Sequence, residues 1–264
     1  MTKRVISVFL CALCVISSFS FIVSAKENKE YTSDNFLSVA DGIIAWKKAD
    51  NGSEPDGYLI NDKYLENAGT TPGDWYPIAL GRLGIQDNNE GYLAVIKDRV
   101  EERYRESGRL SAAKATEWHR IALAVLAMGG DPTNFGTDEN GAPINLIADG
   151  TYDRGKTTPL GRQGINGWIW GLITLDSMRY AVPDGAYNTR DDIIVEIISK
   201  QLSDGGFALS SDDADPDITA MAITALAPYY NSENIYSYHR KALSADESKT
   251  VNEVVDAAVL FLSR

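Results

Sequence analysis

Cysteine is scarce in this sequence, and its position excludes several kinds of chemistry. The chain has two cysteines, Cys11 and Cys14, and both lie near its start, inside an apolar leader-like stretch. Without that stretch the chain can form no disulfide, bind no metal through a thiolate and use no cysteine nucleophile. It has only two histidines, His119 and His239, so a zinc site built from Asp, Cys and His cannot be assembled. We therefore expect no metal and no cofactor.

Positive charge is also in short supply. The chain has 25 Lys and Arg against 37 Asp and Glu, a formal net charge of −12. So acidic a chain repels phosphate backbones, and we expect no nucleic-acid partner. The acidic residues are spread through stretches such as 50–56 and 212–217 rather than gathered in a tail, which is typical of solubility outside the cell.

Long apolar runs are confined to the first 25 residues. Lys3 and Arg4 precede an apolar run from Val5 to Val23, and small residues ending at Ala25 follow. This pattern predicts a cleaved signal peptide over 1–25 and a flexible mature N-terminus over 26–33. The mature protein would then be secreted or lie at the cell surface without a membrane span. An uncleaved membrane anchor is the alternative, although serines interrupt the run.

Strand-like alternation over a useful length is missing, whereas apolar residues recur every three to four positions. The sequence therefore predicts one all-α domain over 34–264. Side chains suited to capping a helix stand at Asp74, Ser111, Asn166, Thr189 and Asp217, and Thr189 has Asp192 three residues on. The predicted helices cover 34–48, 74–84, 89–106, 111–128, 166–181, 190–202, 217–229 and 249–263.

The predicted helices are of two kinds. Segments such as 121–128 and 218–226 are rich in small residues and apolar nearly all round, which indicates burial on all sides, whereas 89–106 and 190–202 are amphipathic. The buried kind recurs at roughly 40 to 50 residues, a spacing that suits helical hairpins stacked in an inner and an outer layer. An irregular helical domain is the alternative.

Four segments support the stacked arrangement. They read GDWYPIALGRLG (73–84), ATEWHRIALAVLAMGGDPTNFG (115–136), INGWIWGLITLDSMRY (165–180) and QLSDGGFALSSDDADPDITAMAITAL (201–226). Together they resemble the prenyltransferase and squalene-cyclase repeat superfamily, and in particular its secreted bacterial members. The resemblance implies an α/α toroid of inner and outer helices. The chain holds fewer hairpins than a full toroid, so we expect an incomplete barrel.

The resemblance also implies an enzymatic alternative. Asp215-Pro-Asp-Ile-Thr-Ala220 is similar to the DxDDTA motif of class II terpene cyclases, in which the middle aspartic acid protonates an alkene or epoxide. Aligned on Thr219 and Ala220, that role would fall to Asp217, with Asp215 beside it. Ile218 replaces the carboxylate that helps to hold the acid protonated. The competing interpretation is that Asp217 caps its helix.

Aromatic residues mark a candidate binding site. Five of them, Trp75, Tyr76, Trp118, Trp168 and Trp170, lie on helices of the buried kind. In a toroid such helices line the central cavity, where aromatic rings can hold an apolar or planar ligand; core packing is the alternative.

The leading hypothesis is a non-catalytic binding or surface-interaction module. Its partner would be a small apolar ligand or an extracellular macromolecule, because the chain has no second domain to enclose a cyclase substrate. A cyclase-like or prenyltransferase-like enzyme is the alternative. His119 is expected to be a hydrogen-bonded packing residue rather than a catalytic one.

Overall fold

The computed structural model describes residues 33–154 and 159–264 and divides the chain into two compact units, Met1–Asp50 and Asn51–Arg264. Helix α2 (Ser33–Asn51) is the described part of the first unit. The predicted signal peptide and the polar segment up to residue 32 lie outside the described residues. Within the described ranges, every helix is too short or too polar to cross a membrane.

The prediction of a mostly helical fold is confirmed, and all eight predicted helices are present with ends shifted by a few residues. Short elements that the sequence analysis missed lie between them. In the second unit the helical elements are α3 (Asp62–Leu65), α4 (Thr71–Leu83), α5 (Asn89–Ser107), α6 (Ala115–Ala127), η1 (Ala148–Tyr152), η2 (Leu160–Gln163), α7 (Ile165–Asp176), α8 (Arg190–Ile198), α9 (Pro216–Leu226), η3 (Ala227–Tyr229), η4 (Lys241–Leu243) and α10 (Val251–Leu262).

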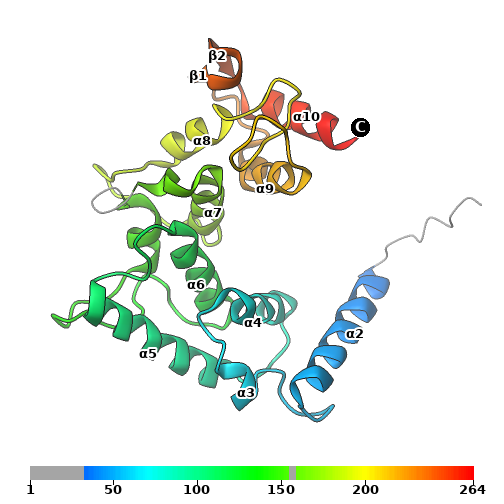
Figure 1. Cartoon of the computed structure of the whole chain (residues 1–264), viewed down its shortest axis with the longest axis vertical. Coiled ribbons are helices and arrows are strands. Elements are labelled where there is room, and N and C mark those ends of the chain that lie inside the picture. Colours follow the sequence, from blue (N-terminus) through cyan, green and yellow to red (C-terminus); the bar gives the residue numbers. More distant parts are fainter. Residues whose placement is uncertain (1–32, 155–158) are drawn as a thin grey trace, which may run out of the picture. The chain divides into compact units, whose positions relative to one another are not determined.

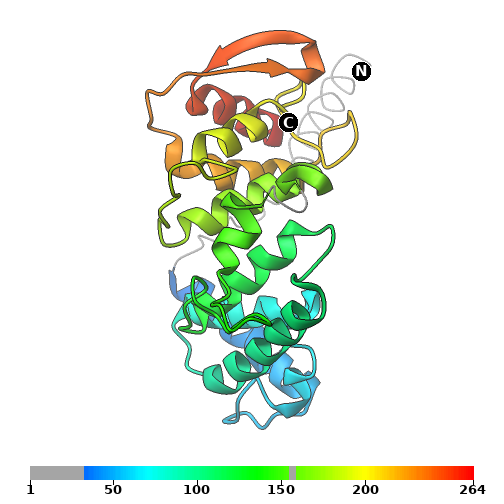
Figure 2. The same cartoon turned by 90° about the vertical axis from the view of Figure 1, so that its left-hand side faces the viewer.

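The expectation that strands are absent was wrong. Strands β1 (Tyr236–Arg240) and β2 (Ala245–Lys249) form an antiparallel hairpin in which Tyr236 is opposite Lys249 and Arg240 is opposite Ala245. β1 alternates between buried and exposed side chains, with Tyr236, Tyr238 and Arg240 buried. β1 packs on α8 (Figure 2).

Four helices of the small-residue kind form a central row, α4, α6, α7 and α9, in which each helix packs on the next (Figure 1). Glycines allow the close approach: a Cβ placed on Gly81 of α4 would lie 2.0 Å from the carbonyl oxygen of Ala127, at the end of α6. The burial on all sides that their composition predicted holds for α6 and α7, in which no residue is exposed, but it was wrong for α9, where Ala220 and Thr224 are exposed.

The amphipathic helices and η1 pack on the central row. α8 contacts α7, α10 contacts α9, and η1 contacts α6. The apolar face of α8 is fully buried, with Ile193, Ile194, Ile197 and Ile198 all at 0% exposure, as its amphipathic pattern predicted. α5 is tied to the row by hydrogen bonds from Tyr92 to Asp74 and from Trp118 to Tyr104.

The turn at Gln201–Phe207 joins the row to α10. Phe207 is fully buried, and the Gln201 side-chain amide donates to the carbonyl oxygens of Gly205 and Val254. Gly205 has a φ of 95°, and a Cβ there would lie 2.5 Å from the Ala257 carbonyl oxygen. Only glycine meets both requirements without strain, so this element is a packing device.

Candidate functional site

Two tryptophans from different helices of the central row touch each other. The rings of Trp75 on α4 and Trp170 on α7 have centroids 5.5 Å apart and an interplanar angle of 56°. Trp75 is 42% exposed, although most of its neighbours on α4 are buried or half-buried. Exposed aromatic rings of this kind often mark a binding surface, and two cavities share this pair as a wall.

The larger of the two cavities, which we call the apolar groove, has a volume of about 740 Å³. Arg82 and Asp176 add charge to its lining. Asp176 accepts from Arg190 Nε at 2.9 Å and from the Tyr229 hydroxyl at 2.8 Å, so its charge is already balanced. Besides the tryptophans, the apolar lining includes residues of α4, α6 and α7 and of the segments that follow α7 and α9: Ile78, Leu123, Leu126, Ile173, Met178 and Pro228.

The smaller cavity, which we call the polar pocket, has a volume of about 190 Å³. Besides the two tryptophans, its lining is formed by Thr71, Thr116, Arg120 and Asn166. Three of these residues lie in the first turn of α4, α6 and α7. The last residues of the same three helices line the apolar groove, so the helices run parallel and present one end to each cavity.

Arg120 is held rigidly in the polar pocket. Its Nε donates to Asp74 Oδ2 at 2.7 Å, Nη1 to Thr71 Oγ1 at 3.2 Å and Nη2 to the Gly69 carbonyl oxygen at 3.0 Å. Asp74 is fully buried, and its Oδ1 accepts from the Tyr92 hydroxyl and the Gly69 amide, both at 2.7 Å. Burial raises the pKa of the Asp74 carboxyl, while the bonds from Arg120 and Tyr92 oppose that rise.

The prediction that Asp74 caps its helix was wrong. α4 begins at Thr71, with Pro72 in its first turn, so Asp74 lies one turn inside the helix. Its carboxylate is occupied by Arg120 of α6 instead of the amides of its own helix. No local pattern in the sequence indicates this pairing, because the partner lies on another helix.

The other three predicted aromatic residues lie outside the lining of both cavities. Trp118 is 3% exposed, donates from Nε1 to the Tyr104 hydroxyl at 2.8 Å, and carries the Arg154 guanidinium 4.2 Å above its ring. Tyr76 meets Tyr64 edge-on at 6.4 Å. Trp168 lies against Gly161, where a Cβ would be 2.2 Å from the indole nitrogen. The structure thus brings together Trp75 and Trp170 and separates them from the rest.

The aspartates of the cyclase-like motif are both exposed. Asp215 caps α9, because its Oδ1 accepts from the Ile218 amide at 2.9 Å. The predicted cap at Asp217 was therefore wrong by two residues: Pro216 takes the first helical position, which suits its fixed φ and missing amide hydrogen. Asp217 lies in the first turn and lines neither the groove nor the polar pocket.

His119 is a packing residue, as predicted. It is fully buried, and its Nε2 lies 2.9 Å from the Gly150 carbonyl oxygen. Burial lowers the pKa of the imidazole to about 3, so the ring is neutral at physiological pH. Its Nδ1 and the Thr151 hydroxyl oxygen are buried without a hydrogen-bond partner.

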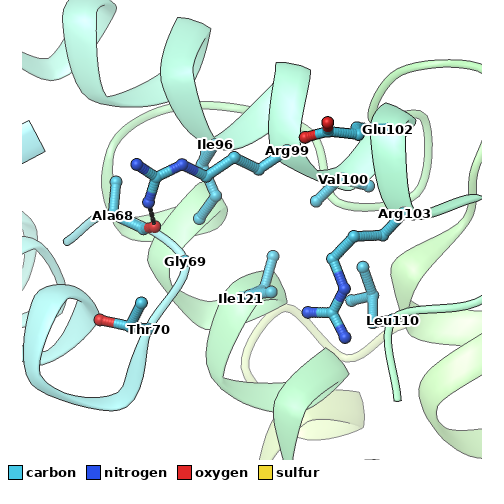
Figure 3. Close-up of a pocket in the computed structure, with 10 residues that line it drawn as sticks. All are labelled: Ala68, Gly69, Thr70, Ile96, Arg99, Val100, Glu102, Arg103, Leu110 and Ile121. Atoms are coloured by element: carbon cyan, nitrogen blue, oxygen red, sulfur yellow. Dashed lines mark hydrogen bonds between the residues drawn. The ribbon is translucent and has the colours of Figure 1, made fainter. Parts of the chain in front are cut away.

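A third cavity, of about 300 Å³, lies between α5 and the row (Figure 3). Arg99 and Arg103 flank an apolar floor that includes Ile96 and Ile121. Both guanidinium groups are engaged, since Arg99 donates to carbonyl oxygens at 65, 66 and 68 and Arg103 is paired with Glu117. None of the residues that line this cavity was predicted from the sequence to bind a ligand. It is a weaker candidate than the tryptophan site because its charged groups are already satisfied.

No family model, curated protein or solved structure matches this chain. Among the described residues, no group of three or more His, Cys, Asp or Glu side chains is placed to hold a metal ion. The tryptophan site therefore has to be interpreted from its own chemistry, which consists of aromatic faces, an apolar groove and a few fixed hydrogen-bonding groups. These are the features of a binding site for a small molecule.

Proposed function

We propose that this protein is an exported, non-catalytic binding module that holds a small apolar ligand against Trp75 and Trp170. The observation that carries the proposal is the contact between these two rings at the wall of a groove of about 740 Å³. Pockets of this size, lined by apolar and aromatic groups with a few polar ones, are typical of small-molecule sites.

The proposal includes an α/α-toroid-like arrangement that forms an incomplete barrel. Support comes from the row of small-residue helices, of which α4, α6 and α7 run parallel, and from the amphipathic helices packed on it. In such an arrangement the core lies between the row and the amphipathic layer, and the other face of the row provides the binding surface.

A non-catalytic role is favoured because the carboxylates next to the two tryptophans and their cavities are already paired. Asp74 is bound by Arg120, and Asp176 by Arg190. A carboxylic acid kept protonated for catalysis needs an apolar shelter, whereas Asp217 is exposed to water. Export is supported by the leader-like pattern over residues 1–25.

Fluorescence titration with Nile red, a planar neutral apolar dye, tests the proposal. We expect saturable binding that Trp75→Ala weakens at least about tenfold, because the ring forms much of the groove wall. Tyr187→Ala is the control: Tyr187 is an exposed aromatic residue of the same unit, at 58%, but it does not line the groove. Equal affinities of the two variants, or no saturable binding, would remove the proposal's support.

Incubation with polyprenyl substrates tests the alternative, a class II terpene-cyclase-like or prenyltransferase-like enzyme with Asp217 as the general acid. Turnover that is abolished by Asp217→Asn would replace the binding proposal. An unchanged substrate leaves the binding module as the better account.

A further inference from the structure

The polar pocket identifies the ligand class further. We infer that the ligand is an amphipathic molecule whose apolar body lies in the groove and whose head is a carboxylate in the polar pocket, bound by Arg120. This inference rests on the proposed function, because it assigns a second part of the same site. It is carried by the wall that the two cavities share and by hydrogen-bonding groups that the chain itself leaves unused.

The two cavities lie next to each other and share one wall. Trp75 and Trp170 belong to the lining of both, so a molecule lying across the rings reaches into each cavity. The groove offers a largely aliphatic surface, whereas the polar pocket offers two threonine hydroxyls, an amide and a guanidinium. A single ligand that contacts both must therefore have an apolar part and a polar part.

Arg120 has donors to spare. Its three hydrogen bonds to Asp74, Thr71 and Gly69 use three of the five guanidinium N–H groups. Among the described residues the remaining two N–H groups make no hydrogen bond, and they belong to a side chain that lines the pocket. The planar fork of a guanidinium matches a carboxylate, and such charge-assisted bonds are about twice as strong as neutral ones.

The guanidinium is also preorganised. Asp74 fixes it from behind and is fully buried, with both oxygens already accepting hydrogen bonds. A ligand therefore meets a receptor group whose orientation has been set before binding, which lowers the entropic cost of association. The carboxylate of Asp74 does not line the pocket and does not compete for the free N–H groups.

Asn166 supplies the second unused group. Its side-chain oxygen is buried and has no hydrogen-bond partner, although the residue lines the pocket. Turned over, the amide presents its NH₂ group to the same place and becomes a donor to the ligand head. The helix dipoles also favour an anionic head here. α4, α6 and α7 begin at this end, their N-cap residues make no side-chain cap, and a helix N-terminus carries a partial positive charge.

Arg82 is the competing position for an acidic head. It lines the groove at the opposite end of α4, but its side chain is exposed. A charge pair in water is screened and weak, whereas the Arg120 side chain is only 12% exposed, so a pair with it is screened less. The polar pocket is therefore the better site for the carboxylate.

Calorimetric titration of the purified protein with octanoate and with octanol tests the inference. The two probes share an apolar chain and differ in the head. We expect octanoate to bind at least about tenfold more tightly than octanol, and Asn166→Asp to abolish this preference, because it places a second negative charge beside the head. Thr116→Val should weaken octanoate a few-fold and leave octanol unchanged, since it removes, without adding charge, a hydroxyl that is bound only through a long 3.4 Å contact to Gln163 Oε1.

Asn89→Asp is the matched control. Asn89 is also in the first turn of a helix, α5, and its side-chain oxygen is also buried without a partner, but it lines neither cavity. It should keep the preference for octanoate. Circular dichroism shows whether each variant folds, and Thr116→Val decides the test if Asn166→Asp does not.

The outcomes separate the two proposals. Equal binding of octanoate and octanol, or binding of neither while Nile red binds, overturns the carboxylate head and leaves the binding module standing. A preference for octanoate that Arg82→Gln removes, while Asn166→Asp and Thr116→Val do not, also overturns the inference by placing the head at the other end. Failure of Nile red and both probes to bind overturns the proposed function itself.

Discussion

Arg120 on α6 places its Nε 2.7 Å from Oδ2 of Asp74 on α4, and the Asp74 carboxylate has no exposure to solvent. The pair joins two neighbouring helices of the central row directly behind the polar pocket. It therefore has two tasks: it ties α4 to α6, and it fixes the guanidinium that faces the pocket.

Replacing Asp74 by asparagine should be strongly destabilising. The substitution leaves the Arg120 guanidinium nearly buried without its counter-charge, and breaking a buried pair in this way costs about 3–5 kcal/mol. Urea unfolding measures the loss. Glu117→Gln is the control, because its partner Arg103 is 36% exposed and a pair of that kind contributes about 1 kcal/mol or less. Similar losses in the two variants would contradict the importance assigned to Asp74.

The neutral, buried His119 should make stability depend on pH. Its pKa falls from 6.5 in the unfolded chain to about 3 in the folded protein, so between these values the unfolded state binds the proton and the folded state does not. Stability is therefore complete above pH 6.5 and falls as the pH drops, by up to about 1.4 kcal/mol per pH unit.

Unfolding experiments between pH 6.5 and 5 check this dependence. His119→Gln should show a smaller slope than the unmodified protein, because glutamine does not titrate. His239→Gln serves as the control, since His239 is exposed on the β1–β2 hairpin. Parallel slopes for His119→Gln and the unmodified protein would show that the imidazole is not buried as described.

A side chain at Gly81 should force α4 and α6 apart. A Cβ there would lie 2.0 Å from the Ala127 carbonyl oxygen, well inside van der Waals contact. We expect Gly81→Ala to reduce the free energy of unfolding by about 1–3 kcal/mol. Gly42→Ala in α2 is the opposite case: a Cβ there meets nothing within 4 Å, so far-ultraviolet circular dichroism should show unchanged or higher helicity.

Asp215, rather than Asp217, should matter for the stability of α9. Asp215→Ala removes the side chain that accepts from the Ile218 amide and should cost about 1 kcal/mol. Asp217→Ala changes an exposed first-turn residue and should stay within about 0.5 kcal/mol. Urea unfolding distinguishes them, and a larger loss for Asp217→Ala would reverse the assignment of the cap.

Local signals in the sequence predicted the helices well. The capping box at Thr189 and Asp192 is present, and the isoleucines of α8 are buried. The other four predicted caps, at Asp74, Ser111, Asn166 and Asp217, were wrong, because α4, α6, α7 and α9 begin after Thr70, Lys114, Gly164 and Asp215. The hairpin was not predicted, because its local strand signals are weak. β1 does alternate, but over only five residues, and β2 reads Ala-Asp-Glu-Ser-Lys, which has little strand preference of its own.

The candidate site was only partly predictable. Composition marked five aromatic residues, but it could not show that Trp75 meets Trp170 while Trp118 turns toward Tyr104 and Arg154. Asp74 gave a capping signal on sequence grounds, although its real partner is on another helix. Which side chains meet across the row is decided by helix packing, and a single sequence carries little information about it.

The contact between Trp75 and Trp170 also supplies the protein with an internal optical reporter. The two indoles come from α4 and α7, which are separated along the row by α6. Their excited states can couple only when all three helices are correctly stacked. A near-ultraviolet signal from this pair would therefore report the assembly of the row as a whole, whereas the far-ultraviolet signal reports each helix alone.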